Sequence, residues 1–192
     1  MASLVGFEAA MADADAATAA DAVARAALLH AAILAFGGVP LLFMGDEIAL
    51  TNDRDYARRG TGNDGRWLHR PFMDWQRVRT LEHSDAPFAA FHARLRGLIA
   101  ARRRLDVLHA ANATHVVQGG APEVLAFVRE SSAEKLLFLG NFSGRRVTWQ
   151  PPAGNAVDLP CRARDAMSGN AVVLDHPLDL GPYAVLWLHS TL

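Results

Sequence analysis

The chain has 192 residues, of which 51% are hydrophobic and 20% are charged, as in an ordinary globular protein. Its formal net charge of -1 gives no electrostatic reason to expect nucleic acid or an anionic membrane as a partner. The single cysteine, Cys161, excludes an internal disulfide and is expected to be a buried, inert thiol. The N-terminus has no secretory pattern and the apolar runs are too short to cross a bilayer, so we expect a cytoplasmic protein.

The first part of the chain predicts two helices with a strand between them. Alanine and leucine, the strongest helix formers, dominate residues 15–36, and a Gly-Gly pair ends the run. The apolar run Val39–Met44 predicts a strand that is buried on both faces, as in a parallel sheet. Apolar residues at helical spacing predict a second helix over 88–99, with Pro87 in its first turn. Helix, strand, loop and helix form the pattern of a β/α unit.

The connection between this strand and the second helix covers residues 45–85. Most connections in compact domains have about 4–6 residues, so this one is far too long to be a simple link. Disorder is not expected, because low hydrophobicity is what keeps segments unfolded and this one contains Trp67, Phe72, Met73 and Trp75. We therefore predict an ordered, functional loop.

The second part of the chain changes character after Arg104. Short strand-like runs alternate with turn signals rich in glycine, serine and proline. The runs are residues 114–117, 124–129, 136–142, 147–149, 172–174 and 183–189. Strands at this spacing predict an antiparallel β-sandwich.

The polar patterns of the long loop predict neither a cofactor nor a metal ion. Residues 60–65 satisfy G-x-G-x-x-G, but a dinucleotide fingerprint must follow a strand and open a helix. Asp53, Asp55 and Asp64 have the spacing of a calcium-binding loop, yet Arg58 takes the place of the required glycine. The eight histidines are scattered along the chain without metal-ligand spacing.

A series of motifs occurs in order along the chain. Gly38–Glu47, with the sequence GVPLLFMGDE, resembles the eighth barrel strand of glycoside hydrolase family 13, the α-amylase superfamily. Asn52-Asp53 and the later run Arg66–Pro71 (RWLHRP) are similar to the amylosucrase and sucrose hydrolase branch of that family. Further matches are residues 2–7 before the seventh barrel helix, 91–104 in the last barrel helix, and 140–143, 165–169 and 180–188 in the C-terminal β-sandwich.

The resemblance implies a fold in two parts. Residues 1–106 would be the C-terminal remnant of a (β/α)8 TIM barrel, formed by helix 7, strand 8, the long loop and helix 8. Residues 107–192 would be an antiparallel β-sandwich domain, with the boundary near 105–112. An upstream barrel segment is needed to complete this fold, because one strand cannot close a barrel.

The resemblance also implies a sugar site in the long loop, since barrels carry their active sites on the loops that follow the strands. In this branch the arginine that matches Arg66 lies at the base of the glucosyl pocket, paired with an aspartate from the N-terminal part. A planar guanidinium suits that role, although Arg66 could instead only brace the loop. Asn52, Asp53, Asp64 and His69 share the loop and are candidates to line sugar subsites.

The adjacent carboxylates Asp46 and Glu47 are expected to anchor the loop backbone. A retaining catalytic pair lies about 5–5.5 Å apart on opposite sides of the bond, which neighbours in sequence do not achieve. In the family the catalytic carboxylates come from earlier strands, so no catalytic residue is expected in this chain, which alone should be inactive.

The resemblance implies that the chain is part of a parent enzyme, which would bind sucrose and α-glucan. The parent would transfer glucose from sucrose to α-1,4-glucan, as amylosucrase does, or hydrolyse sucrose, with retention. One alternative is a non-catalytic carbohydrate-binding sandwich in which Trp149 or Trp187 stacks on sugars, although Trp187 alternates in its strand as a core residue would. Another is an interaction module that completes a barrel supplied by another chain.

Overall fold

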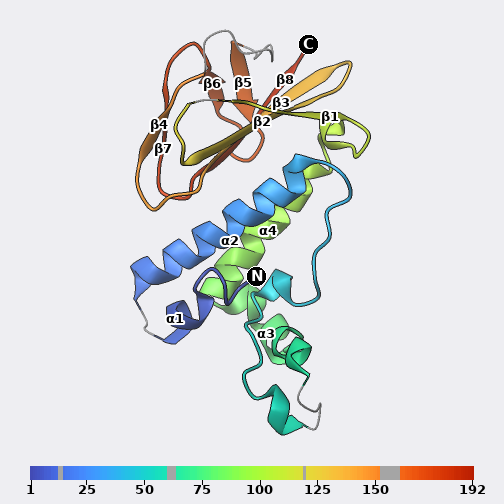
Figure 1. Ribbon diagram of the computed structural model, residues 1–192, viewed down its shortest axis with the longest axis vertical. Helices are drawn as coiled ribbons and strands as arrows, with labels where there is room; N and C mark the ends of the chain where they lie inside the picture. Colours follow the sequence, from blue (N-terminus) through green and yellow to red (C-terminus); the bar gives the residue numbers. More distant parts are fainter. Residues whose placement is uncertain (13–14, 60–63, 119, 152–160) are drawn as a thin grey trace. The chain divides into compact units, whose positions relative to one another are not determined.

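The computed structural model describes residues 1–12, 15–59, 64–118, 120–151 and 161–192 (Figure 1). Its contacts divide the chain into two compact units. The first comprises Met1–Ala27 with Leu41–Leu95, and the second comprises Leu28–Pro40 with Arg96–Leu192. Helices α2 (Ala16–Phe36) and α4 (Pro87–Arg102) contribute residues to both units. The domain boundary expected near residues 105–112 stays a prediction.

The described part of the first unit is helical. Besides residues of α2 and α4, it contains α1 (Phe7–Ala12), η1 (Asp46–Ile48), η2 (Tyr56–Arg59), η3 (Gly65–His69), α3 (Trp75–Thr80) and η4 (Leu81–His83). The predicted helices over 15–36 and 88–99 are thereby confirmed. Helix α2 begins after Asp15, whose carboxylate accepts the N–H of Thr18 at 2.9 Å and so caps the helix. Phe7 and Phe91 are buried in this unit and meet edge to face, with ring centroids 5.9 Å apart.

Residues Val39–Met44 form no strand, contrary to the prediction of a buried one. The side chains of Val39 and Leu41 are 83% and 85% exposed, and Phe43 and Met44 are exposed as well. A strand needs a neighbour that takes up its backbone hydrogen bonds, and none of the described strands pairs with this segment. The apolar run is therefore an exposed, extended connection in this chain.

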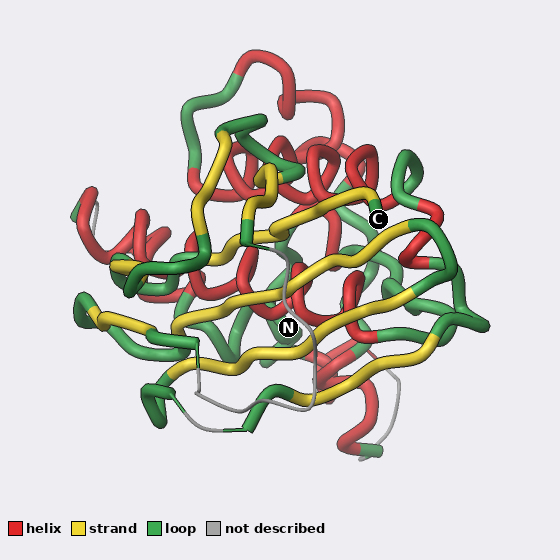
Figure 2. Tube along the Cα trace, turned by 90° about the horizontal axis from the view of Figure 1, so that it is seen from above, coloured by secondary structure: helices red, strands yellow, loops and turns green. Residues whose placement is uncertain are grey.

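The second unit carries the strands. After η5 (Asp106–Leu108) come β1 (Ala113–Val116), β2 (Val124–Glu130), β3 (Glu134–Asn141), β4 (Val147–Trp149), β5 (Arg162–Asp165), β6 (Ala171–Val173), β7 (Leu178–Leu180) and β8 (Val185–Thr191). The first sheet has six strands in the order β1-β2-β3-β8-β5-β6, and β4 pairs with β7 in a second sheet. Figure 2 shows the longer strands side by side. All pairings are antiparallel, as predicted.

Two of these strands were not predicted. Strand β5 has the sequence RARD, and its exposed arginines hide the alternation by which Ala163 and Asp165 are buried. Strand β7 has only three residues. Short strands carry too little periodicity to be recognised without their partners.

The central strands of the large sheet are buried on both faces. On one face Val128, Leu137 and Leu188 belong to a core cluster that also contains Trp149 and Leu180 from the second sheet. The other face carries Phe127 and Phe138, stacked at 4.5 Å, together with Leu28 and Phe36 from the C-terminal half of α2. Burial on both faces explains why β2 and β3 are almost continuously apolar.

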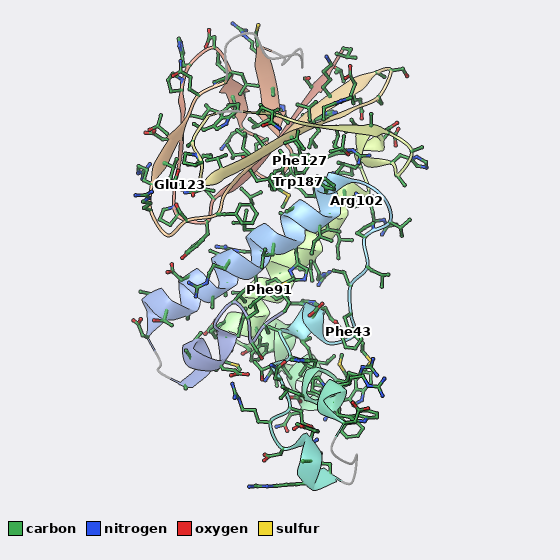
Figure 3. All side chains as sticks on the ribbon, viewed as in Figure 1. Phe43, Phe91, Arg102, Glu123, Phe127 and Trp187 are labelled. Atoms are coloured by element: carbon green, nitrogen blue, oxygen red, sulfur yellow. The ribbon has the colours of Figure 1, made fainter. Side chains whose placement is uncertain are left out.

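The two tryptophans considered for a sugar-stacking platform belong to these cores. Trp149 and Trp187 are both 0% exposed, and Figure 3 labels Trp187 within the strand-bearing unit. The core position expected for Trp187 is confirmed. Neither ring has an accessible face on which a sugar could stack.

Cys161 is exposed, so the prediction of a buried thiol is wrong. The residue directly precedes β5, and its side chain is therefore not directed into the core by the strand pairing that starts at Arg162. Its carbonyl oxygen accepts the N–H of Leu174 at 2.9 Å, which fixes the backbone but not the thiol.

Helix α2 is also the one helix in the described residues that is long and apolar enough to cross a membrane by length and composition. The sequence-based expectation counted only apolar runs without a polar residue, and these are shorter than the helix because His30 lies within it. Half of its most apolar 18-residue window is buried within the protein, as in the core helix of a globular domain.

Candidate functional site

A tight turn follows the exposed run Val39–Met44 in the first unit. Gly45 has a φ of 95° and Ala49 a φ of 52°, both in the left-handed region. The Asp46 carboxylate accepts the Phe43 N–H at 3.3 Å, and the Glu47 carboxylate accepts the Gly45 N–H at 2.8 Å. The two carboxylates thus anchor loop backbone, as the sequence predicted.

The far side of the turn is held by side chains from two helices. Arg77 of α3 donates from Nη1 to the carbonyl oxygens of Ile48 and Ala49 at 3.2 and 3.1 Å. Nδ1 of His92 in α4 lies 2.8 Å from the carbonyl oxygen of Glu47. Peptide groups that the turn leaves without a helix or strand partner are satisfied in this way, which makes the turn a rigid support.

A pocket of about 200 Å³ lies beside this turn and is formed entirely by residues of the first unit. Its lining combines apolar side chains with a few polar groups. The lining residues are Met1, Phe43, Met44, Gly45, Asp46, Leu50, Thr51, Asn52, His69 and Pro71. Apolar side chains combined with placed polar groups are typical of small-molecule sites, and here the polar groups form the larger part of the lining surface.

Two of the five predicted site residues, Asn52 and His69, line this pocket together. Their side chains are 17 positions apart in sequence, and Nδ1 of His69 lies 3.1 Å from Oδ1 of Asn52. The next residue joins the same two segments, because the N–H of Asp53 donates to the carbonyl oxygen of Leu68 at 2.8 Å. The structure therefore assembles one polar corner of the pocket from both ends of the loop.

Asp53 serves the loop rather than the pocket. Its side chain is 10% exposed, accepts the N–H of Asp55 at 3.0 Å and lies 3.6 Å from Nε of Arg59. It is not part of the pocket lining. These contacts tie down the turn that leads into η2.

Arg66 and Asp64 form a local ion pair outside the pocket lining. Oδ1 and Oδ2 of Asp64 accept from Nε of Arg66 at 2.9 Å, and Oδ2 accepts from Nη2 at 2.7 Å. The Arg66 guanidinium lowers the pKa of Asp64, and the Arg66 backbone N–H lowers it further. Asp64 also caps η3 by accepting this N–H, so the bracing role considered for Arg66 is present.

The guanidinium of Arg66 is nevertheless open to a ligand or a second carboxylate. Its side chain is 74% exposed. The described residues account for contacts of Nε and Nη2, which leaves Nη1 available within the described part of the chain. Of the glycine pattern at 60–65, residues 60–63 lie outside the described residues.

Sequence patterns did not identify Ser3 as a residue that supports this site. Its hydroxyl oxygen accepts the N–H of Asn52 at 2.7 Å and donates to Oε1 of Glu8 at the same distance. A serine 49 positions before its partner has no sequence pattern that could reveal the contact. Among the residues that the structure describes, no three His, Cys, Asp or Glu side chains are grouped as metal ligands.

Comparison with known structures shows the class of fold. No protein-family profile matches the chain. Solved structures of α-amylase-family enzymes match it over most of its length at low identity, and at this level the likeness establishes the fold alone. Helices followed by an antiparallel β-domain are consistent with the end of a (β/α)8 barrel and its C-terminal domain, so the predicted fold class is confirmed.

Three of these structures show the extent of the likeness. AmyP in complex with maltose matches with a TM-score of 0.71 and 15% identity, over 88% of this chain and 35% of its own. Trehalose-6-phosphate hydrolase TreA of Bacillus licheniformis matches with a TM-score of 0.60 and 18% identity, over 86% and 38%. A MutB variant in complex with the substrate sucrose matches with a TM-score of 0.59 and 16% identity, over 87% and 38%. The chain therefore spans about a third of the length of the proteins it matches.

Proposed function

We propose that the chain is the C-terminal part of a retaining enzyme that acts on α-glucosides, in the amylosucrase and sucrose hydrolase branch of glycoside hydrolase family 13. The parent enzyme would transfer glucose from sucrose to α-1,4-glucan or hydrolyse sucrose. Matched structures that bind sucrose and maltose, and the RWLHRP run at Arg66–Pro71, support the proposal.

The observation that carries the proposal is the pocket beside the Gly45 turn, where Asn52 and His69 meet. Amide and imidazole groups donate and accept hydrogen bonds, and so match the hydroxyls of a sugar. The apolar lining from Phe43, Met44 and Pro71 suits the carbon-bound face of the ring. We assign this pocket to one sugar unit of the substrate.

Arg66 has a second place in the proposal. Its exposed guanidinium holds Asp64 through one edge and keeps Nη1 for a carboxylate contributed by the rest of the enzyme. Arginine suits such a shared role because its fork of donors can hold two acceptors at once.

The chemistry itself is assigned to residues outside this chain. A retaining mechanism requires two carboxyl groups about 5–5.5 Å apart, one as nucleophile and one as acid/base. Asp46, the one carboxylate among the lining residues, and its neighbour Glu47 already accept backbone N–H groups of the turn. We expect the chain alone to release no fructose from sucrose.

The exposed run Val39–Met44 is evidence for the proposal that the remaining barrel strands are contributed from outside this chain. Val39, Leu41 and Phe43 alternate along the chain and leave apolar side chains in solvent. Apolar exposure of this kind is what a neighbouring strand would cover. The barrel-completing module is thus the alternative that an observation favours, whereas the buried Trp149 and Trp187 disfavour a stacking module.

Sugar binding tests the proposal on the chain as it is. Saturation-transfer NMR with millimolar maltose and sucrose is expected to show contact with the wild-type chain. His69→Ala should abolish that contact, whereas His83→Ala, at an exposed histidine outside the pocket lining, should leave it unchanged. Equal signals from both variants would contradict the assignment of the pocket.

A parallel assay addresses the missing chemistry. Purified chain is incubated with sucrose and the free fructose is measured, with none expected. Fructose release that disappears in Asp46→Asn or Glu47→Gln would place the catalytic carboxylates in this chain and overturn the proposal. The DNA upstream of Met1 then separates the alternatives, because an in-frame extension that encodes earlier barrel strands favours an enzyme part over a separate module.

A further inference from the structure

A continuous set of polar contacts leads from the surface to the pocket in the first unit. Nη2 of Arg54 donates to Oε2 of Glu8 at 2.8 Å, and the Ser3 hydroxyl donates to Oε1 of Glu8 at 2.7 Å. The Asn52 N–H donates to Ser3 Oγ at 2.7 Å, and Oδ1 of Asn52 lies 3.1 Å from Nδ1 of His69. Three separate stretches of sequence meet in this series.

We propose that Ser3 is a positioning residue for the pocket. By holding the backbone of Asn52, it keeps the side-chain oxygen Oδ1 of Asn52 against Nδ1 of His69. This contact selects the His69 tautomer with the proton on Nδ1. Nε2 of His69 is then a hydrogen-bond acceptor for a hydroxyl of the ligand. The part that concerns the ligand rests on the proposed sugar-binding function, whereas the part that concerns the tautomer does not.

The assignment follows from which groups can donate. A side-chain carbonyl oxygen only accepts, so the contact at 3.1 Å requires a proton on Nδ1 of His69. A neutral imidazole carries one N–H, and the proton on Nδ1 therefore leaves the lone pair on Nε2. The ring is exposed and lines the pocket, so this acceptor can be reached by a small molecule.

Glu8 orients the Ser3 hydroxyl that holds Asn52. A hydroxyl has one proton to donate, and its direction toward the Glu8 carboxylate leaves the oxygen lone pairs for the Asn52 N–H. The hydrogen bond from Arg54 lowers the pKa of Glu8, and the bond from Ser3 lowers it further, so Glu8 is the anionic acceptor at neutral pH. Networks of this kind fix orientation more strongly than single contacts do.

The alternative is that Ser3 only supports the fold. The backbone contact between Asp53 and Leu68 already joins the two loop segments, so loss of the Ser3 hydroxyl need not separate them. A purely structural serine would change thermal stability on substitution but leave the His69 tautomer as it was. The tautomer is therefore the measurement that separates the two roles.

The test uses the full chain labelled with ¹⁵N-histidine and long-range ¹H–¹⁵N correlation at a pH where the imidazoles are neutral. The His69 signals are identified by their loss in His69→Gln. We expect the Nδ1–H form to predominate in the wild type. In Ser3→Ala the ratio of the Nδ1–H form to the Nε2–H form should fall roughly fivefold, which is the factor that one net hydrogen bond contributes. Ser3→Thr, which keeps the hydroxyl, should restore the wild-type ratio.

Two further variants keep the proposal testable. Ser132→Ala, at an exposed serine of the β2–β3 turn, is the matched control and should leave the ratio unchanged. Asn52→Ala removes the acceptor directly and should abolish the preference for Nδ1–H even if Ser3→Ala folds poorly. An Nε2–H form in the wild type, or an unchanged ratio in Ser3→Ala or Asn52→Ala, would overturn the proposal.

Addition of maltose to the same samples tests the ligand part separately. A shift of the His69 Nε2 signal in the wild type supports a hydroxyl donor at that nitrogen. No shift, with the tautomer series as expected, contradicts sugar binding at His69 and leaves the positioning role of Ser3 standing.

Discussion

Nη1 of Arg129 donates to the carbonyl oxygen of Phe36 at 2.9 Å, so a buried guanidinium from strand β2 closes the C-terminal end of helix α2. The last carbonyl groups of a helix have no partner within it, and a cation there also meets the negative end of the helix dipole. The same guanidinium binds Thr114 Oγ1 at 2.9 Å and the carbonyl oxygen of His109 at 2.6 Å. Burial lowers the pKa of Arg129, and the charge of Arg102 lowers it further, yet arginine stays protonated.

Substitution of Arg129 tests how much this closure stabilises the second unit. Arg129→Met is expected to lower the free energy of unfolding by about 2–3 kcal/mol, because three partly buried hydrogen bonds lose their charged donor. Urea denaturation followed by circular dichroism measures the change. Arg103→Gln, at an exposed arginine directly after helix α4, is the control and should lower the free energy of unfolding by less than about 0.5 kcal/mol. Equal losses in both variants would show that the closure contributes nothing specific.

Asp165 joins a strand to the turn that follows it. Its buried carboxylate accepts from the N–H and hydroxyl of Ser168 at 3.0 and 2.6 Å, and from the N–H of Trp187 at 3.2 Å. Asp165→Ala should lower the free energy of unfolding by about 2–3 kcal/mol, since the buried N–H of Trp187 and the donors of Ser168 lose their acceptor. Asp175→Ala, at an exposed aspartate, is the control for removal of a carboxylate and should change thermal unfolding little. A stable Asp165→Ala protein would contradict the role given to this carboxylate.

Gly140 allows the large sheet to approach helix α2 closely. A Cβ at this position would lie 2.8 Å from Cδ1 of Leu28 and 2.9 Å from Cε1 of Phe138. Gly140→Ala is expected to lower the free energy of unfolding by about 1–3 kcal/mol through overpacking. In a double-mutant cycle, Gly140→Ala should cost less free energy of unfolding in the Leu28→Ala background than in the wild type, because the clash with Leu28 is then absent. Gly181→Ala, where a Cβ would meet nothing within 4 Å, is the control.

The Asp64–Arg66 pair predicts a pH dependence at the loop. Arg66 lowers the pKa of Asp64 below its ordinary value of 3.8, so the contribution of the pair is fully present above that value. It is lost as the pH falls through the lowered pKa of the folded state. The ¹³C titration of the Asp64 carboxyl should therefore have its midpoint below 3.8 in the wild type and move up toward it in Arg66→Gln.

A second arginine serves as the comparison for this titration. Arg70 lowers the pKa of Asp64 only through its charge, and this is the smallest contribution. Arg70→Gln should thus move the midpoint less than Arg66→Gln does. A larger effect of Arg70→Gln would show that the hydrogen bonds between Asp64 and Arg66 are not the main cause.

Much of the fold could be predicted because its signals are local. Helix α2 follows from a long run rich in alanine and leucine that ends at a Gly-Gly pair, and the β2–β3 hairpin follows from two apolar runs with a serine turn between them. The same reasoning was wrong for Cys161 and for the strand expected over Val39–Met44. In both cases the residue type indicated burial, but burial depends on neighbours that no local pattern specifies.

For the site, the sequence alone determined the set of candidate residues, their order along a loop of unusual length, and their likeness to a branch of sugar-active enzymes. Only the tertiary structure decided that Asn52 and His69 share a pocket, that Asp53 serves the loop, and that Ser3 holds Asn52. Periodicity and capping act between residues a few positions apart, and can therefore be recognised in the sequence. The contact between Ser3 and Asn52 joins residues 49 positions apart, and its geometry exists only after the helices of this unit have packed.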